Sequence, residues 1–351
     1  MVESPDEKRG LSYRDAGVDI DAQDEAIRRL RPHARSTHTK EVLADIGTFG
    51  GLFHLTPKGI KDPVLVASTD GVGTKLKIAV MAGRHDGVGY DLVSHCVNDI
   101  LVQGAIPLFF LDYFATGKLD PGVVEAVLSG MARACREVGC ALIGGELAEM
   151  GDLYRPGDYD IAGFIVGAVE RAHVITGAGI RPGDVVLALP SVGLHTNGYS
   201  LARKIFFDRL GLSHDARIDV LGGTVADVLL APHRSYLAPL KRLIGTGKLK
   251  GLAHITGGGI TDNVPRILPA GCAARIDRSR IQVLPVFRFL QEKGVVAQSE
   301  MWRTFNMGVG MVIVTSSADA GAVEKHLADC GETPVRIGVI EQGARGVVYE
   351  D

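Results

Sequence analysis

DGVGYDLVSHCVNDILVQG, residues 86 to 104, has the apolar spacing of a helix. Its apolar side chains occur nearly all round that helix rather than on one stripe, which is typical of a helix that is mostly buried. The apolar runs at 63–69 and 106–116, on either side of it, have the composition of strands. A buried helix between two strands predicts alternating β and α units around one core.

The same alternation extends along the chain. Strand-like runs occur at 140–146 and 160–170, with a helical pattern at 122–139 between them. The stretch TGAGIRPGDV, residues 176 to 185, is rich in glycine and is the best candidate for a domain boundary. After it the pattern restarts, with strands expected at 184–191, 308–315 and 335–341 and helices at 197–210, 225–246 and 318–331. We therefore expect a mixed α/β protein with an N-terminal arm and glycine-rich loop (1–60), a first domain (61–172) and a second domain (180–351).

Composition excludes several classes of function. The chain has 351 residues, of which 46% are hydrophobic, and its 38 basic and 41 acidic residues leave no positive surplus for binding nucleic acid. Its five cysteines are odd in number and lack CxxC spacing, which favours reduced thiols in a cytoplasmic protein. We find no apolar run of the roughly 18 residues that a membrane span requires, and therefore expect no membrane partner.

Polar residues of the 86–104 helix fall on one stripe. Asp91, His95, Asn98 and Asp99 occupy positions i, i+4, i+7 and i+8. Buried carboxylates are costly unless they are paired or bound to a cation, so this stripe indicates a metal or a charged ligand. The alternative is a solvated stripe on an ordinary amphipathic helix.

Two further acids end predicted strands. Asp70 follows the strand at 63–69, and Glu146 closes the strand at 140–146. Carboxylate oxygens are ligands that Mg²⁺ prefers, and after Asp70 the chain reads GVGTK, where Gly71 and Gly73 can present backbone N–H groups beside the positive charge of Lys75. This glycine segment is neither a Walker A sequence nor G-x-G-x-x-G, and alone it is more often a structural turn.

The second half contains three more polar segments. SVGLHTNGYSLARK (191–204) places His195 and Asn197 between a strand and a helix, where an anion or substrate could bind, although His195 is also consistent with a capping or core histidine. Single polar groups in HITGGGITDNVPR (254–266) and MWRTFNMGVGM (301–311) are more often structural than functional. We find no serine–histidine–aspartate order, zinc spacing or nicotinamide fingerprint.

Eight segments together resemble one enzyme family, phosphoribosylformylglycinamidine cyclo-ligase, also called aminoimidazole ribonucleotide synthetase. They are LSYRDAGVDIDA, TDGVGTK, HDGVGYDLVSHCVNDILVQGA, PLFFLDYFATGKLD, GGELAEM, HTNGYSLARK, HITGGGITDNVPR and RTFNMGVGM. The resemblance implies ATP- and Mg²⁺-dependent closure of the imidazole ring of formylglycinamidine ribonucleotide in purine biosynthesis. It also implies a homodimer, in which the sheets of the N-terminal domains pair and the C-terminal domain covers the site.

Site residues follow from the resemblance, position by position. The magnesium ligands that it implies are Asp70, Asp91, Glu146 and, as a further candidate, Asp99. It also implies two groups of ATP-binding residues. A loop that closes over the nucleotide contains Gly47, Phe49, Gly50 and Gly51. The residues around the phosphates are Gly71, Val72, Gly73, Thr74, Lys75 and Asn98. Lys75, His195 and Asn197 are implied as catalytic residues. The sequence leaves open a requirement for potassium.

One position departs from the family pattern, because Leu147 stands where family members have threonine in GGETAEM. The lost hydroxyl removes a hydrogen-bond partner for a phosphate or water, whereas the carboxylate of Glu146 remains.

The chemistry that the resemblance implies is phosphorylation of the formyl-amide oxygen to an iminophosphate, followed by ring closure. Two alternatives stay open. One is another enzyme of the same ATP-binding superfamily, such as a selenophosphate synthetase, a thiamine monophosphate kinase or formylglycinamidine ribonucleotide synthetase. The first of these normally has a reactive cysteine or selenocysteine near its N-terminus, and this chain has no cysteine before Cys96. The other alternative is a catalytically silent dimeric binding protein.

Overall fold

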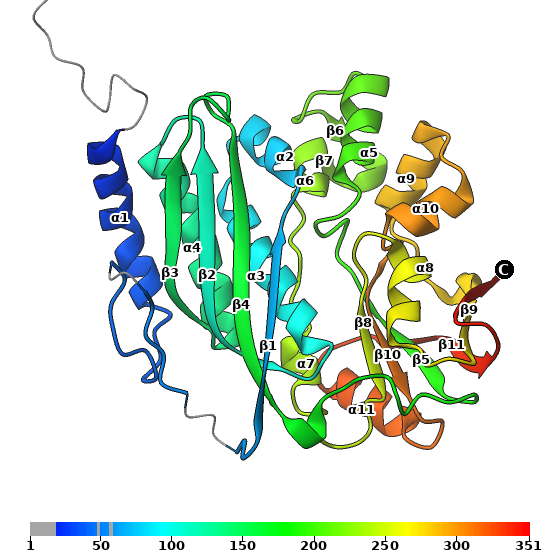
Figure 1. Cartoon of the computed structure of the whole chain (residues 1–351). Helices are drawn as coiled ribbons and strands as arrows, with labels where there is room; N and C mark the ends of the chain where they lie inside the picture. The colour runs from blue at the N-terminus through cyan, green and yellow to red at the C-terminus, as the bar shows by residue number, and fades with distance from the viewer. Residues whose placement is uncertain (1–18, 48–49, 56–58) are drawn as a thin grey trace, which may run out of the picture.

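The computed structural model describes residues 19–47, 50–55 and 59–351. The first 18 residues of the expected arm and loop (1–60), and Phe49 within the loop, lie outside the described residues. Two α/β halves stand side by side (Figure 1), which confirms the mixed α/β class. Among the described helices none is long and apolar enough to span a membrane.

The N-terminal half is built on a four-stranded sheet of order β1-β4-β2-β3. Its strands are β1 (Pro63–Gly71), β2 (Ile106–Thr116), β3 (Ala141–Glu149) and β4 (Tyr159–Glu170). β2 and β3 run parallel, and the other neighbours are antiparallel. Its helices are α1 (Ile20–Arg35), α2 (Lys75–Ala82), α3 (Asp86–Leu101) and α4 (Pro121–Val138). The strands and the two central helices expected in this half are therefore confirmed, with ends that differ by up to three residues.

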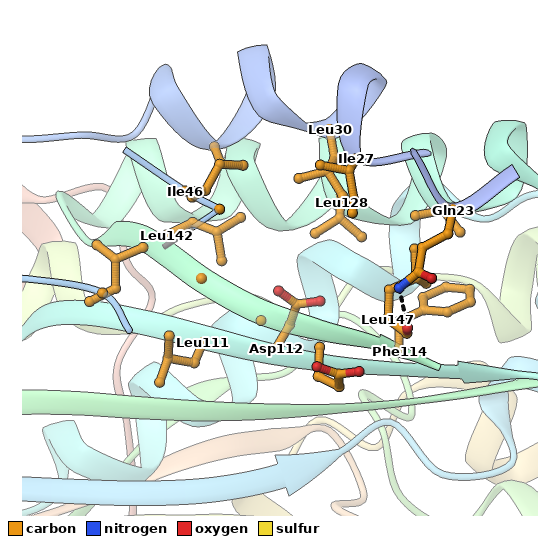
Figure 2. A pocket seen from close by; sticks show the side chains of 18 of the residues that line it. Gln23, Ile27, Leu30, Ile46, Leu111, Asp112, Phe114, Leu128, Leu142 and Leu147 are labelled. Carbon is orange, nitrogen blue, oxygen red and sulfur yellow. Dashed lines mark hydrogen bonds between the residues drawn. The ribbon is translucent and has the colours of Figure 1, made fainter. Parts of the chain in front are cut away.

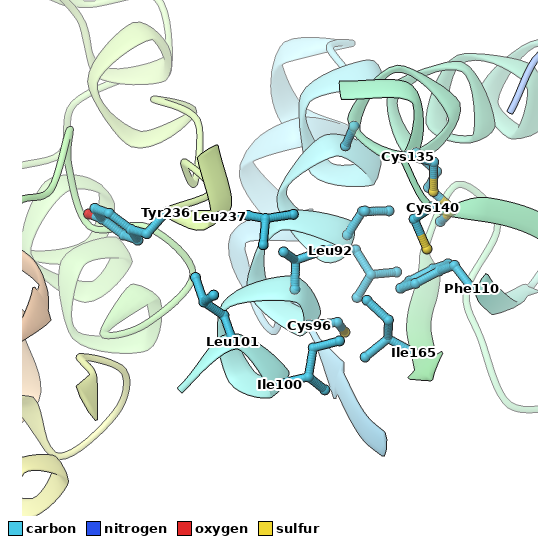
Figure 3. Packing of buried hydrophobic residues seen from close by; sticks show 14 of the residues in the cluster. Leu92, Cys96, Ile100, Leu101, Phe110, Cys135, Cys140, Ile165, Tyr236 and Leu237 are labelled. Carbon is cyan, nitrogen blue, oxygen red and sulfur yellow. The ribbon is translucent and has the colours of Figure 1, made fainter. Parts of the chain in front are cut away.

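α3 is buried, as its sequence predicts. Leu92 and Cys96 on this helix pack with Phe110 and Ile165 of the sheet (Figure 3). α3 also lies very close to α4, and a Cβ atom at Gly89 would stand 1.9 Å from the Val127 carbonyl oxygen. Glycine is thus required at that position for the two helices to approach.

α1 was not expected, because the sequence before residue 60 was interpreted as an irregular arm. Asp19 caps the helix by accepting a hydrogen bond from the Ala22 N–H, and the helix packs against α4 and β3. Only Ala26 and Ala34 of α1 are buried. Ala26, Leu30 and Ala34 nevertheless recur at helical spacing after the capping Asp19, so the sequence held a signal for this helix that was overlooked.

The C-terminal half has a six-stranded sheet of order β12-β9-β11-β5-β10-β8 and a small β6-β7 ribbon. Its strands are β5 (Val185–Pro190), β6 (Arg217–Ile218), β7 (Gly223–Thr224), β8 (Gly251–His254), β9 (Cys272–Asp277), β10 (Val309–Thr315), β11 (Val335–Gln342) and β12 (Gly346–Glu350). Its helices are α5 (Tyr199–Arg203, continued by a π-helical turn, Lys204–Arg209), α6 (Val225–Leu229), α7 (Leu237–Leu240), α8 (Gly259–Asn263), α9 (Pro285–Gly294), α10 (Gln298–Thr304) and α11 (Ala320–Asp329). The strands expected at 184–191, 308–315 and 335–341 are confirmed.

The prediction of a single helix over residues 225–246 is wrong. α6 ends at Leu229, the segment 231–236 is not helical, and α7 is short. Pro232 accounts for the break, because proline lacks an N–H and disfavours helix in the residue before it. The non-helical segment 231–236 contacts α3 of the N-terminal half through hydrogen bonds to Asp91 and Asn98.

Candidate functional site

The polar stripe of α3 faces the C-terminal half rather than solvent. Asp91 and Asn98 are fully buried, and His95 is 2% exposed. Each of the three bonds to a segment of the second half. The solvated-stripe alternative is therefore wrong.

Two residues of the expected site form a buried ion pair instead. Lys75 Nζ lies 2.6 Å from Asp91 Oδ2, and neither side chain is exposed. Lys75 also donates to the carbonyl oxygens of His195 and Ala231, while Asp91 Oδ1 accepts the His233 N–H at 2.6 Å. Burial shifts the pKa of Lys75 down and that of Asp91 up, and their mutual attraction opposes both shifts. In this structure Lys75 is thus not placed to bind phosphate, nor Asp91 to bind a metal.

The contacts of Asn98 likewise do not support the phosphate-binding role expected for it. Its side-chain oxygen accepts the Tyr236 N–H at 2.9 Å, and its amide donates to the Arg234 carbonyl at 2.9 Å. With both ends of the amide used by the 231–236 segment, Asn98 positions that segment rather than a nucleotide phosphate.

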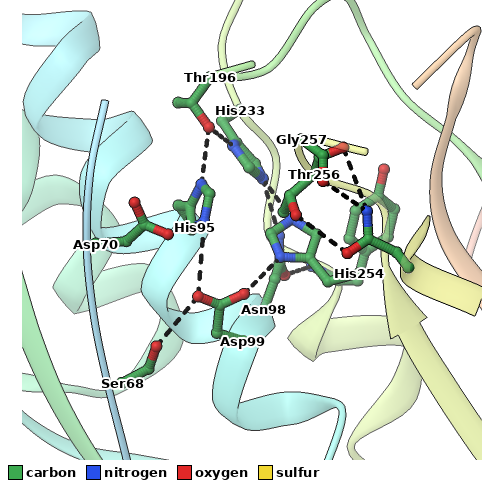
Figure 4. Close-up of polar contacts among 12 residues, drawn as sticks. Ser68, Asp70, His95, Asn98, Asp99, Thr196, His233, His254, Thr256 and Gly257 are labelled. Carbon is green, nitrogen blue, oxygen red and sulfur yellow. Dashed lines mark hydrogen bonds and ion pairs between the residues drawn. The ribbon is translucent and has the colours of Figure 1, made fainter. Parts of the chain in front are cut away.

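Two of the three other acids of the expected metal site, Asp70 and Asp99, do converge (Figure 4). His95 Nε2 lies 2.8 Å from Asp70 Oδ2 and 3.6 Å from Asp99 Oδ2. Asp99 Oδ1 lies 2.9 Å from His254 Nδ1, and Ser68 donates to Asp99 at 3.1 Å. We call Asp70, His95, Asp99 and His254 the cleft cluster.

Both carboxylates of the cleft cluster are held in the ionised form. Partial burial alone would raise the pKa of Asp70, but hydrogen bonding and charge from His95 outweigh it and lower that pKa. Burial likewise opposes ionisation of Asp99, and His254 lowers its pKa. The pKa of His95 is raised, because its two acidic neighbours outweigh burial. The cleft cluster is therefore a preformed set of charges.

The cleft cluster opens into a cavity of about 610 Å³ between the two halves. Its lining is mostly polar and comes from β1, α3, the 175–177 segment, β8 and the segment after β8. Its lining also includes Thr256, Asn263 and Arg266, and the Arg266 guanidinium donates to Asn263 Oδ1 at 3.1 Å. A cavity lined by both carboxylates and an arginine suits a phosphorylated ligand with a bound cation.

Glu146 does not join the cleft cluster. Asp70, Gly163, Asp112 and Gly145 are neighbours in register across the sheet, so they share one face. Glu146 is the next residue along β3 and points to the other face, because side chains alternate along a strand. The structure thus separates Glu146 from Asp70 and Asp99.

Glu146 lines a second cavity, of about 470 Å³, at the β3 edge of the sheet (Figure 2). Gly47, Gly50 and Gly51 of the expected glycine loop also line it, together with apolar side chains of α1 and α4. Asp112 points into this cavity, and burial raises its pKa to about 7. Of the expected nucleotide-binding residues that the structure describes, the loop glycines line this second cavity, whereas Gly71, Val72, Gly73, Thr74, Lys75 and Asn98 line neither of the two cavities.

In the DGVGTK segment, Gly71 ends β1, Lys75 begins α2, and residues 72–74 connect the two elements. Gly73 has a φ of +57°, whereas the φ of Gly71 is not positive. Val72 is fully buried, and the Thr74 hydroxyl lies 3.3 Å from the Ser200 hydroxyl of the C-terminal half.

His195 and Asn197 have different surroundings. His195 is fully buried, its ring stacks on His233 with centroids 4.2 Å apart, and burial lowers its pKa well below the usual range, which favours the core-histidine interpretation. The buried Nδ2 of Asn197 has no hydrogen-bond partner among the described residues. A donor in that state is suited to a ligand.

The carboxylates of the cleft cluster fit the magnesium ion that the resemblance implies. Mg²⁺ is usually held by one or two protein carboxylates, with waters and substrate phosphates completing its shell. Asp70 and Asp99 fit this pattern, since both are ionised and both border the cavity. Asp91 and Glu146 do not, because the first is paired with Lys75 and the second lies in the other cavity.

Three residues of the cleft were missed from the sequence. His254 and Arg266 lie in HITGGGITDNVPR, a segment that was noted but whose single polar groups were considered structural. His233 lies in the range assigned to one continuous helix, and Pro232 was the signal that could have placed it in a loop.

Comparison with known proteins agrees with this architecture. The model of a family described as AIR synthase related protein, N-terminal domain, matches residues 58–169, and that of the corresponding C-terminal domain matches residues 181–351. By fold the chain is similar to a thiamine-monophosphate kinase from Stenotrophomonas maltophilia, with a TM-score of 0.68 and 16% identity over 93% of this chain and 96% of that one. It is also similar to the hydrogenase maturation protein HypE in complex with ATP, with a TM-score of 0.66 and 21% identity over 93% of this chain and 91% of that one.

Sequence relatives are much closer. A phosphoribosylformylglycinamidine cyclo-ligase of Paraburkholderia phymatum is 54% identical over 98% of this chain and 96% of its own length. One from Geobacter sulfurreducens is 51% identical over 97% of this chain and 99% of its own length. With identities above one half over nearly the whole chain, this protein belongs to the phosphoribosylformylglycinamidine cyclo-ligase family.

Proposed function

We propose that this protein uses ATP to close the imidazole ring of formylglycinamidine ribonucleotide, giving aminoimidazole ribonucleotide, ADP and phosphate. The observation that carries the proposal is the convergence of Asp70 and Asp99 on a polar cavity between the two halves. Relatives that are 51–55% identical carry the cyclo-ligase name, which supports this reaction over others of the same fold.

The chemistry needs positioning and charge neutralisation rather than an enzyme nucleophile. The formyl-amide oxygen forms a bond to the γ-phosphorus of ATP while the bond to ADP breaks. The substrate's own amidine-derived nitrogen then attacks the formyl carbon, phosphate leaves with the former amide oxygen, and the nitrogen loses a proton. Mg²⁺, when bound, would neutralise phosphate oxygens.

The cleft residues have separate roles in this proposal. Asp70 and Asp99 hold the metal, and His95 and His254 keep the two carboxylates ionised and oriented. Arg266, which lines the same cavity, binds the ribose phosphate of the substrate, since a guanidinium is suited to phosphate. Asn197 lines neither of the two cavities, so its place near the substrate rests on the family resemblance.

The second cavity has a composition that suits a nucleoside. Apolar side chains from α1 and α4 form much of its lining, and Gly47, Gly50, Gly51 and Glu146 lie at its rim. The glycine loop lies at this cavity, at the β3 edge of the sheet, whereas the cleft borders β1 at the opposite edge and shares no lining residue with it. Within one chain, closure of this loop over an ATP whose phosphate is transferred in the cleft therefore has no support from the geometry.

We also propose a homodimer formed through the N-terminal sheet. Leu65, Tyr113 and Phe164 lie on the face of this sheet opposite to Asp70, and they are 56%, 37% and 41% exposed. Large apolar side chains gathered on one sheet face indicate an interaction surface. A second copy of the chain is the partner that the family resemblance implies.

The alternatives have weaker support. Similarity to the thiamine-monophosphate kinase is 16% in sequence and concerns the fold alone. A catalytically silent binding protein would not explain why Asp70 and Asp99, which are partly buried, are held ionised in a polar cleft. Burying a charge lowers stability unless the charge is paired or binds a ligand.

The direct test is to incubate the purified protein with formylglycinamidine ribonucleotide, ATP and Mg²⁺ and to measure aminoimidazole ribonucleotide and ADP. We expect both products in equal amounts. Absence of the aminoimidazole product, with or without ATP hydrolysis, would contradict the proposal. Parallel incubation with thiamine monophosphate tests the kinase alternative.

A further inference from the structure

The cleft cluster contains two imidazoles beside its two carboxylates, which is more nitrogen than magnesium prefers. His95 Nε2, His254 Nδ1 and a carboxylate oxygen of Asp99 lie within 4.8 Å of one another. Asp70 Oδ2 lies 2.8 Å from the same nitrogen of His95. Mg²⁺ favours oxygen ligands, whereas Zn²⁺ and Co²⁺ readily accept histidine nitrogen together with carboxylate oxygen. We propose that these four side chains bind Zn²⁺, or a transition-metal cation of the same class, when no nucleotide fills the cleft.

The outer nitrogens of both histidines are already fixed by neighbouring groups. His95 Nδ1 lies 2.7 Å from the Thr196 hydroxyl, and His254 Nε2 lies 3.0 Å from His233 Nε2. His233 Nδ1 in turn lies 3.2 Å from the same hydroxyl of Thr196. Histidines that bind metals are normally oriented by a hydrogen bond at the second ring nitrogen, and both rings have one here.

With a cation bound, one assignment of protons satisfies all three imidazoles in the neutral form. His95 donates from Nδ1 to Thr196, His254 donates from Nε2 to His233, and His233 donates from Nδ1 to Thr196. Asn98 Nδ2 lies 3.2 Å from His233 Nε2 and can donate to that nitrogen too. In the metal-free protein His95 Nε2 and His254 Nδ1 donate to Asp70 and Asp99, and a bound cation would replace those two protons.

The ligands come from both halves of the molecule, so a bound cation would connect them. Asp70 is on β1, His95 and Asp99 are on α3, and His254 ends β8. Four protein ligands suit the tetrahedral geometry of zinc. The Asp70 side chain is 44% exposed at the cavity, which gives a cation a path of entry.

The proposal shares Asp70 and Asp99 with the magnesium role assigned above, yet it does not depend on that role. Zn²⁺ and Mg²⁺ with ATP would compete for the same carboxylates. A binding experiment without nucleotide or substrate therefore tests it separately from the reaction.

The experiment is a titration of chelator-treated, full-length protein with Co²⁺, followed by visible absorption, and with Zn²⁺, followed by calorimetry. A Cys330→Ser background is used, because the Cys330 thiol lies 3.7 Å from His326 Nε2 and could bind cobalt on its own. We expect one ion per chain in this background, with the absorption of a nitrogen- and oxygen-ligated Co²⁺. We expect His95→Gln to bind at least about tenfold more weakly. His173→Gln, which changes an exposed histidine outside the cleft, should bind like the background protein.

A second variant guards against a folding defect in His95→Gln. Asp70→Asn removes a partly exposed ligand, and we expect it too to weaken Co²⁺ binding by at least about tenfold. Thermal unfolding of each variant shows whether it is folded. Unchanged Co²⁺ affinity in folded Asp70→Asn, or no saturable binding by the Cys330→Ser protein, would overturn the proposal.

Discussion

The Lys75 ammonium and the Asp91 carboxylate form an ion pair with no solvent exposure, and this pair joins the two halves of the molecule. Lys75 begins α2 and Asp91 lies in α3, yet both also bond to backbone groups of the C-terminal half. The pair therefore helps to fix how the halves are placed around the cleft. In this structure the pair is thus placed to position the two halves.

Breaking this pair should strongly destabilise the fold. We expect Lys75→Met to lower the free energy of unfolding by about 3–5 kcal/mol, because it leaves the Asp91 carboxylate buried without its partner. Lys75→Met combined with Asp91→Leu should lose less than the single variant, since no charge then remains buried. Urea denaturation followed by circular dichroism measures both.

The control for that experiment is Lys325→Met, which removes an exposed pair with Asp329 on α11. Exposed pairs contribute little, so the unfolding transition should hardly move. Equal destabilisation by Lys75→Met and Lys325→Met would refute the structural role of the buried pair.

Asp70→Asn should abolish turnover while leaving the fold intact. The side chain is 44% exposed, so the substitution costs little stability, but it removes a metal-binding charge beside the phosphates. We expect a loss of at least about 100-fold in kcat, in the range seen when one electrostatic contact to a transition state is removed. Asp86→Asn, which changes an exposed acid at the start of α3 outside the cleft, is the matched control. Near-normal ring closure by Asp70→Asn would exclude the metal role.

Asp112 should make stability depend on pH. Its folded pKa of about 7 lies above the usual value of 3.8, so the folded state holds the proton more tightly than the unfolded chain does. The stabilisation is complete below about pH 4 and is lost as the pH rises through about 7. We therefore expect Asp112→Asn to be more stable than the parent at pH 8, and its unfolding free energy to fall less between pH 5 and pH 8. An identical pH dependence in both proteins would show that Asp112 titrates normally.

The outer face of the N-terminal sheet should carry the dimer contact. We expect Phe164→Glu to shift the protein from dimer to monomer in size-exclusion chromatography with light scattering, because a charge would have to be buried in an apolar contact. Val220→Glu, which changes an exposed residue in the C-terminal half, should leave the mass unchanged. A monomeric parent protein, or a dimeric Phe164→Glu variant, would count against this surface.

Much of the fold could be predicted because the N-terminal half has strong periodic patterns. α3 is apolar on nearly every side, and both its burial and the polar stripe with Asp91 and Asp99 followed from spacing alone. α1 was missed although Asp19 is a capping residue and Ala26, Leu30 and Ala34 follow it at helical spacing. The break at Pro232 was missed although proline is a clear local signal.

The site was predicted in part, because sequence spacing within one element says nothing about which partners other elements supply. Lys75 and Asp91 looked like ligand-binding groups, and only the fold shows that they neutralise each other. Glu146 was grouped with Asp70, but the alternation of side chains along β3 directs it to the other face of the sheet. His233 reaches the cleft through long-range packing, which no local pattern encodes.

The most direct measurement is a crystal structure of the protein with Mg²⁺ and a non-hydrolysable ATP analogue. The account expects the metal to lie within coordination distance of both Asp70 and Asp99, with phosphate oxygens completing its shell and Lys75 still paired with Asp91. A metal bound at Glu146 alone, or bound with Asp70 and Asp99 both out of reach, would contradict the central claim.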